Sequence, residues 1–389
     1  MNQKTVPLPT LSQDEIKRYS RHILLPQVGL EGQKKLKAAS VLIVGTGGLG
    51  SPVALYLAAA GIGRIGLVDH DVVDFSNLQR QIIHAESLLD SPKVESARER
   101  MLSLNPSIQV DAYNEAFTSQ NAFRIAAPYD IIIDGTDNFP TRYLINDLCV
   151  LTGKTNIYGS IYQFEGQASV FQVGDGPCYR CIFPEPPPPA LAPSCGVTGV
   201  LGILPGTVGT IQATETIKII LGIGEPLIGK LMLYSALDMS FDTIILKKNP
   251  ACKVCGEHPQ ITELIDYEEF CGVPSHGHTG SAGKEWDITA LELSQRLAQG
   301  EDLHVIDVRE PQELAISKLD LAQLIPLGQL ASRISELDSN QEIVLICKKG
   351  NRSTLALKIL TAAGFSKLKN LKGGINAWAE DVDDSIIVY

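Results

Sequence analysis

The chain of 389 residues has no long hydrophobic run and no excess of basic residues. Its most apolar stretch, Gly196 to Thr214, is interrupted by five Gly, four Thr and one Pro, so we expect no membrane-spanning segment. Residues 1–11 contain Pro7 and Pro9 and lack the apolar centre of a signal peptide. A net charge of −11 disfavours broad binding to nucleic acid or to anionic membranes. These absences predict a cytoplasmic protein with no membrane partner and no direct nucleic-acid partner.

The remaining composition is that of an ordinary globular chain, with 44% hydrophobic and 20% charged residues. At about 150 residues per domain, the length predicts two or three domains, which are large enough to form cores without covalent cross-links. Eight cysteines in a cytosolic chain are better explained as metal ligands or catalytic thiols than as disulfides.

The first part of the chain has the pattern of a nucleotide-binding α/β domain. Ser12 and Glu15 form a capping-box pattern, which predicts a helix. An apolar strand at 41–44 leads into the glycine-rich segment 45–50, an Ala-rich helix that ends at Gly61, and a second strand at 65–69, which together make a βαβ unit. Further helices are predicted at 93–104 and 143–152, and strands at 131–134, 156–158, 168–173 and 231–234.

Two breaks interrupt this pattern. Six prolines between Pro184 and Pro193 exclude a helix or a central strand and predict a long exposed loop. The segment Gly272 to Gly283 has the composition of a linker. After it, strands at 305–308 and 343–346 alternate with helices at 288–298 and from Ser353 onward. The predicted fold is α/β, with a Rossmann-like domain at 1–265, a linker at 266–284 and a smaller α/β domain at 285–389.

The glycines of the βαβ unit predict a phosphate-binding turn. Gly45, Gly47 and Gly50 match G-x-G-x-x-G, and Asp69 stands at a strand end where it could accept ribose hydroxyls. An NAD-binding domain would fit these residues alone. The additional Arg80, Lys93 and Asp137 favour a triphosphate with Mg²⁺, because two cations can neutralise phosphate oxygens and a carboxylate can hold the metal. The alternative is that these three side chains are solvated surface charges.

Several motifs together resemble the ubiquitin-activating-type adenylyltransferases, above all the molybdopterin-synthase adenylyltransferase group. They are Arg18-Tyr19-Ser20-Arg21-His22-Ile23, Gly45 to Gly50, Ser76-Asn77-Leu78-Gln79-Arg80-Gln81 and Asp134-Gly135-Thr136-Asp137-Asn138, within residues 11–264. The resemblance implies adenylation of the C-terminal glycine of a small ubiquitin-like sulfur-carrier protein. It implies an ATP site lined by Gly48, Asp69, Ser76, Asn77, Leu78, Gln79, Arg80, Lys93, Asp137 and Asn138. It also implies a homodimer in which Arg21 reaches the partner's phosphates, whereas the alternative for Arg21 is an exposed helical charge.

Four cysteines form two C-x-x-C pairs, Cys178 with Cys181 and Cys252 with Cys255. Two such pairs suit a closed tetrahedral Zn²⁺ site, which is structural because no position is left for water. A redox C-x-x-C would need one pair rather than two. The adenylyltransferase family has the same four-cysteine pattern, which supports zinc.

Cys195 follows the proline-rich segment in Pro193-Ser194-Cys195-Gly196. A thiol on such a loop can meet an acyl adenylate or accept sulfur. The sulfurtransferase-fused members of the family have a cysteine in a matching segment, where it is regarded as a thioester-forming or persulfide-resolving residue. The alternative is an unreactive loop cysteine. Cys149 and Cys271 are expected to be structural or incidental.

Cys347 ends a predicted strand and begins the loop Cys347 to Arg352 before a helix. Converging N–H groups and a helix N-terminus would stabilise a thiolate and then a persulfide, and Lys348, Lys349 and Arg352 would add positive charge. With Asp307-Val308-Arg309-Glu310 and Gly373 to Trp378, the loop resembles a rhodanese domain over residues 286–379. A buried core cysteine and a phosphatase are the alternatives, although a phosphatase loop has one more residue. The stretch Ile316 to Asp320 departs from the Gly-His-Ile segment of the family.

These observations predict a nucleotidyltransferase and sulfurtransferase. The first domain would use Mg-ATP to adenylate the carrier, and Cys347 would deliver persulfide sulfur, which a cysteine desulfurase or another donor supplies, to give the carrier thiocarboxylate. Molybdenum cofactor, thiamine, cysteine and tRNA thiolation pathways all stay open. The alternatives are an NAD-dependent oxidoreductase and a non-catalytic module that binds the carrier.

Overall fold

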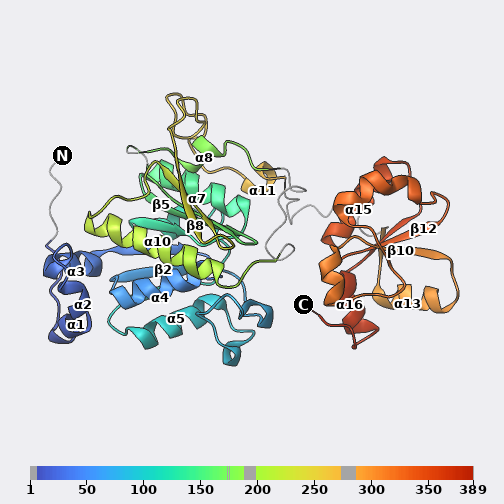
Figure 1. The fold of residues 1–389 in the computed structure, drawn as a ribbon, viewed down its shortest axis with the longest axis horizontal. Helices are drawn as coiled ribbons and strands as arrows, with labels where there is room; N and C mark the ends of the chain where they lie inside the picture. Colours follow the sequence, from blue (N-terminus) through green and yellow to red (C-terminus); the bar gives the residue numbers. More distant parts are fainter. Residues whose placement is uncertain (1–6, 173, 175, 188–198, 273–285, 389) are drawn as a thin grey trace. The chain divides into compact units, whose positions relative to one another are not determined.

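The computed structural model describes residues 7–172, 174, 176–187, 199–272 and 286–388. The chain divides into two compact units, Met1–Pro274 and Ser275–Tyr389, which are described separately (Figure 1). The domain boundaries expected from the sequence, at 265 and 285, stay predictions. Among the described residues, no helix has the length and apolar character that crossing a bilayer requires.

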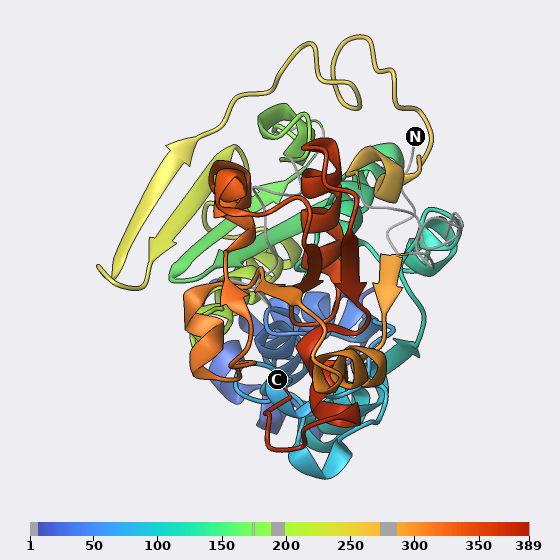
Figure 2. The ribbon, with the colours of Figure 1, turned by 90° about the vertical axis from the view of Figure 1, so that its right-hand side faces the viewer.

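The first unit is built on an eight-stranded sheet in the order β3-β2-β1-β4-β5-β6-β7-β8. The strands from β3 to β5 are parallel, whereas β5, β6, β7 and β8 pair antiparallel. The hairpin of β7 and β8 forms one edge of the sheet and is seen in yellow in Figure 2. The bounds are β1 Ser40–Val44, β2 Arg64–Val68, β3 Gln109–Tyr113, β4 Ile131–Asp134, β5 Thr155–Tyr162, β6 Glu165–Phe171, β7 Lys230–Ser235 and β8 Ser240–Ile245.

Helices cover both faces of this sheet because its central strands are apolar on both sides (Figure 1). One core contains side chains of α4 (Gly50–Ala60), α5 (Lys93–Leu104) and α10 (Leu204–Leu221). The opposite core contains side chains of α6 (Ala122–Ala126), α7 (Phe139–Thr152), α8 (Tyr179–Ile182) and α11 (Tyr267–Phe270). Short 3₁₀ helices η1 (Phe75–Asn77) and η2 (Glu86–Leu88) lie between β2 and α5.

The N-terminal segment is helical, with α1 (Gln13–Arg18), α2 (Ser20–Ile23) and α3 (Gly29–Ala38). The capping box of Ser12 and Glu15 is confirmed, since each side chain accepts a hydrogen bond from the other residue's backbone N–H. The helix is interrupted at Tyr19, whose buried hydroxyl accepts a hydrogen bond from Asn105 at 2.8 Å. This contact ties the N-terminal helices to the segment that follows α5.

The second unit has a parallel five-stranded sheet in the order β11-β10-β12-β13-β9. Its strands are β9 Asp287–Ile288, β10 Leu303–Asp307, β11 Gln323–Leu324, β12 Glu342–Ile346 and β13 Leu368–Leu371. One core packs under α14 (Leu327–Leu330), η5 (Ala331–Glu336) and α15 (Asn351–Ala362), and the other under α13 (Ala290–Ala298) and α16 (Gly374–Asp381). The 3₁₀ helix η4 (Pro311–Ala315) follows β10.

The sequence did not predict α10, because its Gly, Thr and Pro residues suggest an interrupted apolar run rather than a helix. The structure explains Gly209 in this helix. A Cβ at Gly209 would lie 2.5 Å from Pro52 Cγ and 2.6 Å from the carbonyl oxygen of Leu49, so only glycine allows α10 to approach α4 this closely. The helix α7 begins at Phe139 rather than at the predicted Tyr143, because Asn138 caps it and Pro140 fits its first turn.

Candidate functional sites

The glycine-rich loop after β1 lies against the loop after β4. Gly45 has a φ of +91°, and a Cβ there would lie 2.8 Å from the carbonyl oxygen of Gly135. A Cβ at Gly50 would lie 2.0 Å from the carbonyl oxygen of Gly45. β1 pairs with β2 on one side and with β4 on the other, so the chain changes direction across the sheet at this point. Ligands of open α/β sheets bind in the crevice at such a switch point, outside the carboxyl ends of the strands.

Asp69 follows β2 and holds the glycine-rich loop. Its Oδ2 accepts hydrogen bonds from the Thr46 backbone N–H at 2.8 Å and from Thr46 Oγ1 at 3.0 Å. Its Oδ1 accepts one from the Asp71 N–H at 3.0 Å. Asp69 is half-buried, so its carboxylate is partly accessible to solvent beside the backbone of the glycine-rich loop.

The two expected phosphate cations lie near this loop. Lys93 begins α5 and is 5% exposed, with its Nζ 2.9 Å from Asp71 Oδ2. This burial argues against Lys93 as an ordinary solvated charge. Arg80 is half-buried and donates to the Ser76 carbonyl oxygen at 3.1 Å. A Cβ at Gly48 would lie 3.7 Å from Arg80 Cγ, which places the stem of Arg80 over the loop.

Ser76, Asn77, Leu78 and Gln79 form and follow η1, which Asp74 caps by accepting from the Ser76 N–H at 2.8 Å. Ser76 and Gln79 are exposed, and Asn77 and Leu78 are half-buried. A Cβ at Gly202 would lie 2.3 Å from Gln79 Oε1, so Gln79 packs against the segment before α10. Of this expected motif, Arg80 is the residue that lies against the glycine-rich loop, beside Gly48.

Asp137 and Asn138 follow β4, next to the Gly135 loop, and both are exposed. The Asn138 side chain accepts from the Thr141 N–H at 3.0 Å and so caps α7. Asp137 makes no hydrogen bond or ion pair with the other described residues, which leaves its carboxylate oxygens available to a ligand. The main chain next to Asp137 is held in place through the preceding residue, Thr136.

The buried ion pair of Asp134 and Arg142 holds Thr136 in place. Thr136 donates from its N–H and its Oγ1 to Asp134 Oδ1 at 3.0 and 2.6 Å, and Arg142 donates to the Thr136 carbonyl oxygen at 3.4 Å. Arg142 Nε lies 3.5 Å from Asp134 Oδ2, and the guanidinium packs over the rings of Phe139 and Tyr158. Burial raises the pKa of the Asp134 carboxyl, and the charge of Arg142 opposes that shift.

Arg21 lies exposed on α2. Within the described part of the chain, no hydrogen bond or ion pair joins it to the residues of the glycine-rich loop. The role of Arg21 in a partner's phosphate site stays a prediction.

The four C-x-x-C cysteines come together in one cluster. Their sulfur atoms all lie within 4.8 Å of one another. The Cys178–Cys181, Cys178–Cys252 and Cys181–Cys255 sulfur distances are 3.9, 3.6 and 3.4 Å. Four sulfurs about 2.3 Å from one zinc ion in a tetrahedron would be about 3.8 Å apart. The donor set and its spacing therefore fit Zn²⁺.

The residues between the first two ligands attach the cluster to α7. Arg180 is 1% exposed and donates two hydrogen bonds to Asp147, each at 2.8 Å. Its guanidinium lies between the rings of Tyr143 and Phe270, 4.7 and 4.4 Å from their centroids. The Tyr267 hydroxyl also donates to Asp147 at 2.9 Å. Asp147 thus joins α7, α8 and α11.

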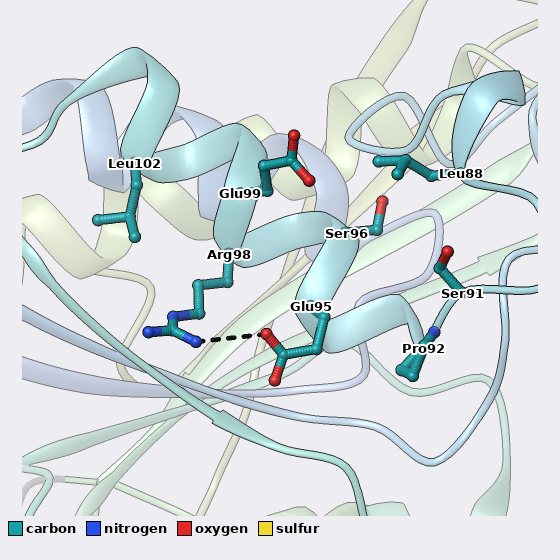
Figure 3. A pocket seen from close by; sticks show the side chains of 8 residues that line it. All are labelled: Leu88, Ser91, Pro92, Glu95, Ser96, Arg98, Glu99 and Leu102. Atoms are coloured by element: carbon teal, nitrogen blue, oxygen red, sulfur yellow. Dashed lines mark hydrogen bonds and ion pairs between the residues drawn. The ribbon is translucent and has the colours of Figure 1, made fainter.

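Cys195 lies outside the described residues. Most of the predicted proline-rich loop and linker lie outside them as well. A hollow of about 410 Å³ beside α5 is lined by Leu88, Ser91, Pro92, Glu95, Ser96, Arg98, Glu99 and Leu102 (Figure 3). It includes none of the expected ATP-site residues, and its Glu95–Arg98 pair is a surface ion pair.

Cys347 directly follows β12 and begins a loop whose groups donate hydrogen bonds toward its sulfur. The Gly350 N–H donates to Sγ at 3.1 Å, and Ser353 Oγ lies 3.3 Å from Sγ at the start of α15. The thiol is 1% exposed. N–H donors and a helix N-terminus at one sulfur stabilise negative charge there.

The glycines of the Gly373-Gly374 motif allow α16 to approach this loop. A Cβ at Gly374 would lie 2.2 Å from the Cys347 carbonyl oxygen. As a result, the Ile375 N–H donates to the Cys347 carbonyl oxygen at 2.8 Å. Two helix N-termini, those of α15 and α16, therefore meet at the loop that holds Cys347.

The positive charge near Cys347 differs from the expectation. Arg352 donates two hydrogen bonds to Glu313, at 2.6 and 2.7 Å, so its charge is compensated locally. Lys349 is exposed and Lys348 half-buried. Because Glu313 lies in η4, the pair links the first half of this unit to the sulfur-binding loop, despite the departure at Ile316 to Asp320.

Sequence reasoning did not identify several supporting residues, namely His84, Ser96, Arg142, Asp147, Glu313 and Ser353. Glu313 could have been found from its spacing, since it lies three residues after Glu310 in a capping box. His84 and Asp147 carry no such local signal, because their partners are distant in the sequence.

The fold is α/β in both units, with a glycine-rich loop at the switch point of the first sheet and a cysteine loop at two helix N-termini in the second unit. Comparison with known families agrees: residues 19–254 match the ThiF family, and residues 289–381 match the rhodanese-like domain. The chain belongs to the ThiF family and carries a C-terminal rhodanese-like domain.

Full-length relatives share this architecture. The chain is 48% identical over 389 residues to the probable adenylyltransferase/sulfurtransferase MoeZ of Mycobacterium tuberculosis, which covers 98% of this chain and 97% of that protein. It is 41% identical over 399 residues to the adenylyltransferase and sulfurtransferase MOCS3-1 of Zea mays, covering 98% and 85%. The corresponding MOCS3 of Drosophila yakuba is 42% identical over 396 residues, covering 97% and 86%. The protein is therefore an adenylyltransferase and sulfurtransferase, and the oxidoreductase and non-catalytic alternatives are set aside.

Solved structures of similar fold support the architecture of the first unit. The crystal structure of E. coli MccB with ATP has a TM-score of 0.53 at 25% identity, covering 63% of this chain and 75% of that one. E. coli MccB with MccA-N7isoASN has a TM-score of 0.56 at 24% identity, covering 62% of this chain and 75% of that one. This similarity confirms the Rossmann-like α/β fold that the sequence predicted.

Proposed function

We propose that the chain adenylates the C-terminal glycine of a small ubiquitin-like sulfur-carrier protein and then converts the adenylate to a thiocarboxylate. The observation that carries the proposal is that Asp69, the glycine-rich loop and Asp137 follow the neighbouring strands β2, β1 and β4. Arg80 lies against the glycine-rich loop, and Lys93 pairs with Asp71, two residues after Asp69. Cys347 supplies the second activity in the same chain. The groups of the first unit support ATP as the substrate, because backbone N–H groups and two cations suit its phosphates and the Asp137 carboxylate suits a metal.

In the first step, the carrier carboxylate attacks the α-phosphorus of ATP, an acyl–AMP bond forms and pyrophosphate leaves. Catalysis of this step needs in-line placement and positive charge rather than a strong base. Arg80 and Lys93 would neutralise phosphate oxygens, and the Asp69 carboxylate would accept ribose hydroxyls. Asp137 would hold Mg²⁺, which adds positive charge at the phosphates when bound.

In the second step, a persulfide on Cys347 attacks the acyl carbonyl and AMP leaves, giving an acyl disulfide. A second thiol then attacks the sulfur of Cys347, so that a new disulfide forms and the carrier departs as a thiocarboxylate. Cys195 is our candidate for that thiol. A cysteine desulfurase or another sulfur donor would reload Cys347 after a reductant restores both thiols.

The remaining site proposals concern structure and assembly. Cys178, Cys181, Cys252 and Cys255 would bind one structural zinc ion. The chain would form a homodimer in which Arg21 contributes to the partner's phosphate site. The protein is expected in the cytoplasm.

The test compares the two activities in one variant. Cys347→Ala should keep carrier-dependent ATP–pyrophosphate exchange at the wild-type rate and lose thiosulfate sulfurtransferase activity. Mass spectrometry on candidate carriers should detect the thiocarboxylate with the wild-type chain only. Normal thiocarboxylate formation by the variant would show that Cys347 does not carry the sulfur.

A further inference from the structure

His84 lies beneath the glycine-rich loop and joins it to α5. It is 8% exposed. Its Nε2 lies 3.0 Å from the carbonyl oxygen of Thr46, and its Nδ1 lies 2.9 Å from Oγ of Ser96. Ser96 is buried on α5, three residues after Lys93, and its helix borders the hollow of Figure 3.

The two partners define the state of the imidazole. A carbonyl oxygen can only accept, so Nε2 carries the hydrogen and donates to Thr46. In the neutral ring, Nδ1 then accepts from the Ser96 hydroxyl. Burial lowers the pKa of His84 and the charge of Lys93 acts in the same direction, while the Thr46 carbonyl and Asp69 oppose them. Burial and Lys93 thus favour the neutral ring, in which one donor and one acceptor each have a partner.

Thr46 is held from both sides by this arrangement. Its N–H and hydroxyl donate to Asp69, and its carbonyl oxygen accepts from His84. The next residue, Gly47, is fixed by its own carbonyl oxygen, which accepts from the buried Ser51 hydroxyl at 2.7 Å. The backbone on either side of the Thr46–Gly47 peptide thus has fixed partners before any nucleotide binds.

We propose that His84 is a positioning residue that sets the glycine-rich loop in its ATP-binding conformation and couples it to the helix that begins with Lys93. This inference rests on the proposed function, since it assumes that the loop binds the phosphates of ATP. A single imidazole would then fix the relative positions of three groups that bind ATP, namely the glycine-rich loop, Asp69 and Lys93. His84 itself needs no contact with the nucleotide.

The experiment compares two amides at position 84. In His84→Gln, the amide nitrogen replaces Nε2 and can still donate to the Thr46 carbonyl oxygen. In His84→Asn, the shorter amide can reach Ser96 but not Thr46. The dissociation constant for Mg-ATP is measured by calorimetry on the full chain, with His84→Leu as the apolar variant and the exposed His258→Leu as the control.

We expect His84→Asn and His84→Leu to weaken Mg-ATP binding about tenfold, the factor for one buried hydrogen bond. His84→Gln and His258→Leu should stay within about twofold of the wild type. Equal losses in all three His84 variants, following their thermal stability, would reduce His84 to a packing residue and overturn the inference. A wild-type chain that does not bind Mg-ATP would overturn the proposed function and the inference together.

A second measurement determines the tautomer of His84 in the wild-type chain. Nitrogen NMR of imidazole-labelled wild-type protein should show the neutral Nε2–H tautomer for His84 at pH 7, assigned by the loss of its signal in His84→Gln. An Nδ1–H tautomer or a charged ring would contradict the donation to Thr46, and with it the proposed positioning.

Discussion

Asp137 and Asn138 are adjacent and both exposed, yet the structure gives them different tasks. Asn138 is used by the protein itself, because its side chain caps α7. Asp137 has no partner among the described residues, while the backbone of the preceding Thr136 is fixed by Asp134 and Arg142. A loop held this firmly can present one free carboxylate in a defined place.

Asp137→Ala should therefore abolish chemistry without disturbing the fold. We expect ATP–pyrophosphate exchange to fall at least about 100-fold, the scale for losing one electrostatic contact of a transition state. The thermal midpoint should be unchanged, because no described contact of the protein is lost. Asp242→Ala, at an exposed position of β8, serves as the control. Undiminished exchange in Asp137→Ala would remove the metal assignment.

In the second unit, Gly374 determines how closely α16 approaches the Cys347 loop, because it has no side chain. Gly374→Ala would put a Cβ 2.2 Å from the Cys347 carbonyl oxygen at a φ of +65°. The left-handed backbone alone costs about 1–2 kcal/mol for a residue with a Cβ. We expect thiosulfate sulfurtransferase activity to fall at least about tenfold, while exchange in the other unit persists.

The matched change is Gly328→Ala in α14, where a Cβ meets nothing within 4 Å. It should leave sulfur transfer intact. If both alanine variants kept full activity, the close approach of α16 would not matter for the loop.

At the scale of elements, α7 joins the two special regions of the first unit. Its N-terminus is capped beside Asp137, and its second half holds Arg180 of the cysteine cluster through Asp147. Loss of the cluster should therefore also destabilise α7. It would disturb the buried Arg180–Asp147 ion pair, and a broken buried pair leaves an uncompensated charge.

Cys252→Ser tests the zinc proposal at this level. The wild-type chain should contain one zinc ion per molecule by elemental analysis, and the variant should contain much less. Because structural zinc contributes folding free energy, the thermal midpoint of the first unit should fall by more than about 5 °C. Cys271→Ser, a buried cysteine outside the cluster, should lose stability but keep the metal. If removal of all metal from the wild-type chain left its thermal midpoint unchanged, the proposal of a structural zinc site would be wrong.

The sequence predicted those elements whose signals are local. The bounds of α5 and β4 agree with the structure because an apolar run or a helical period defines each of them. α10 was not predicted, because Gly209 reads as a helix breaker until its packing on α4 is seen. In the same way, the motifs of the expected phosphate site are visible in the sequence because each is local, whereas His84 and Asp147 act through partners far away in sequence.

At the scale of the whole molecule, Arg21 makes the strongest claim about assembly. If it reaches a partner's phosphates, a chain with Arg21→Ala and a chain with Asp137→Ala should complement each other. Each is inactive alone, but one of the two sites in a mixed dimer has both groups. Exchange activity should therefore return on mixing, to roughly a quarter of the wild-type level for random pairing of equal amounts.

Mixing is followed by native mass spectrometry, so that mixed dimers are counted directly. Their presence without recovered activity would mean that Arg21 acts in its own chain or not at all. Mixing Arg21→Ala with itself at the same total concentration gives the baseline.

Each hydrophobic cluster of the described chain takes its members from one compact unit only. A lesion in one core is therefore not transmitted to the other through shared packing. In genetic terms, an allele that lacks Cys347 and an allele that lacks the proposed ATP-binding residues should complement in one cell. The carrier protein can diffuse from the protein encoded by one allele to the protein encoded by the other. The single reading frame would then behave as two cistrons.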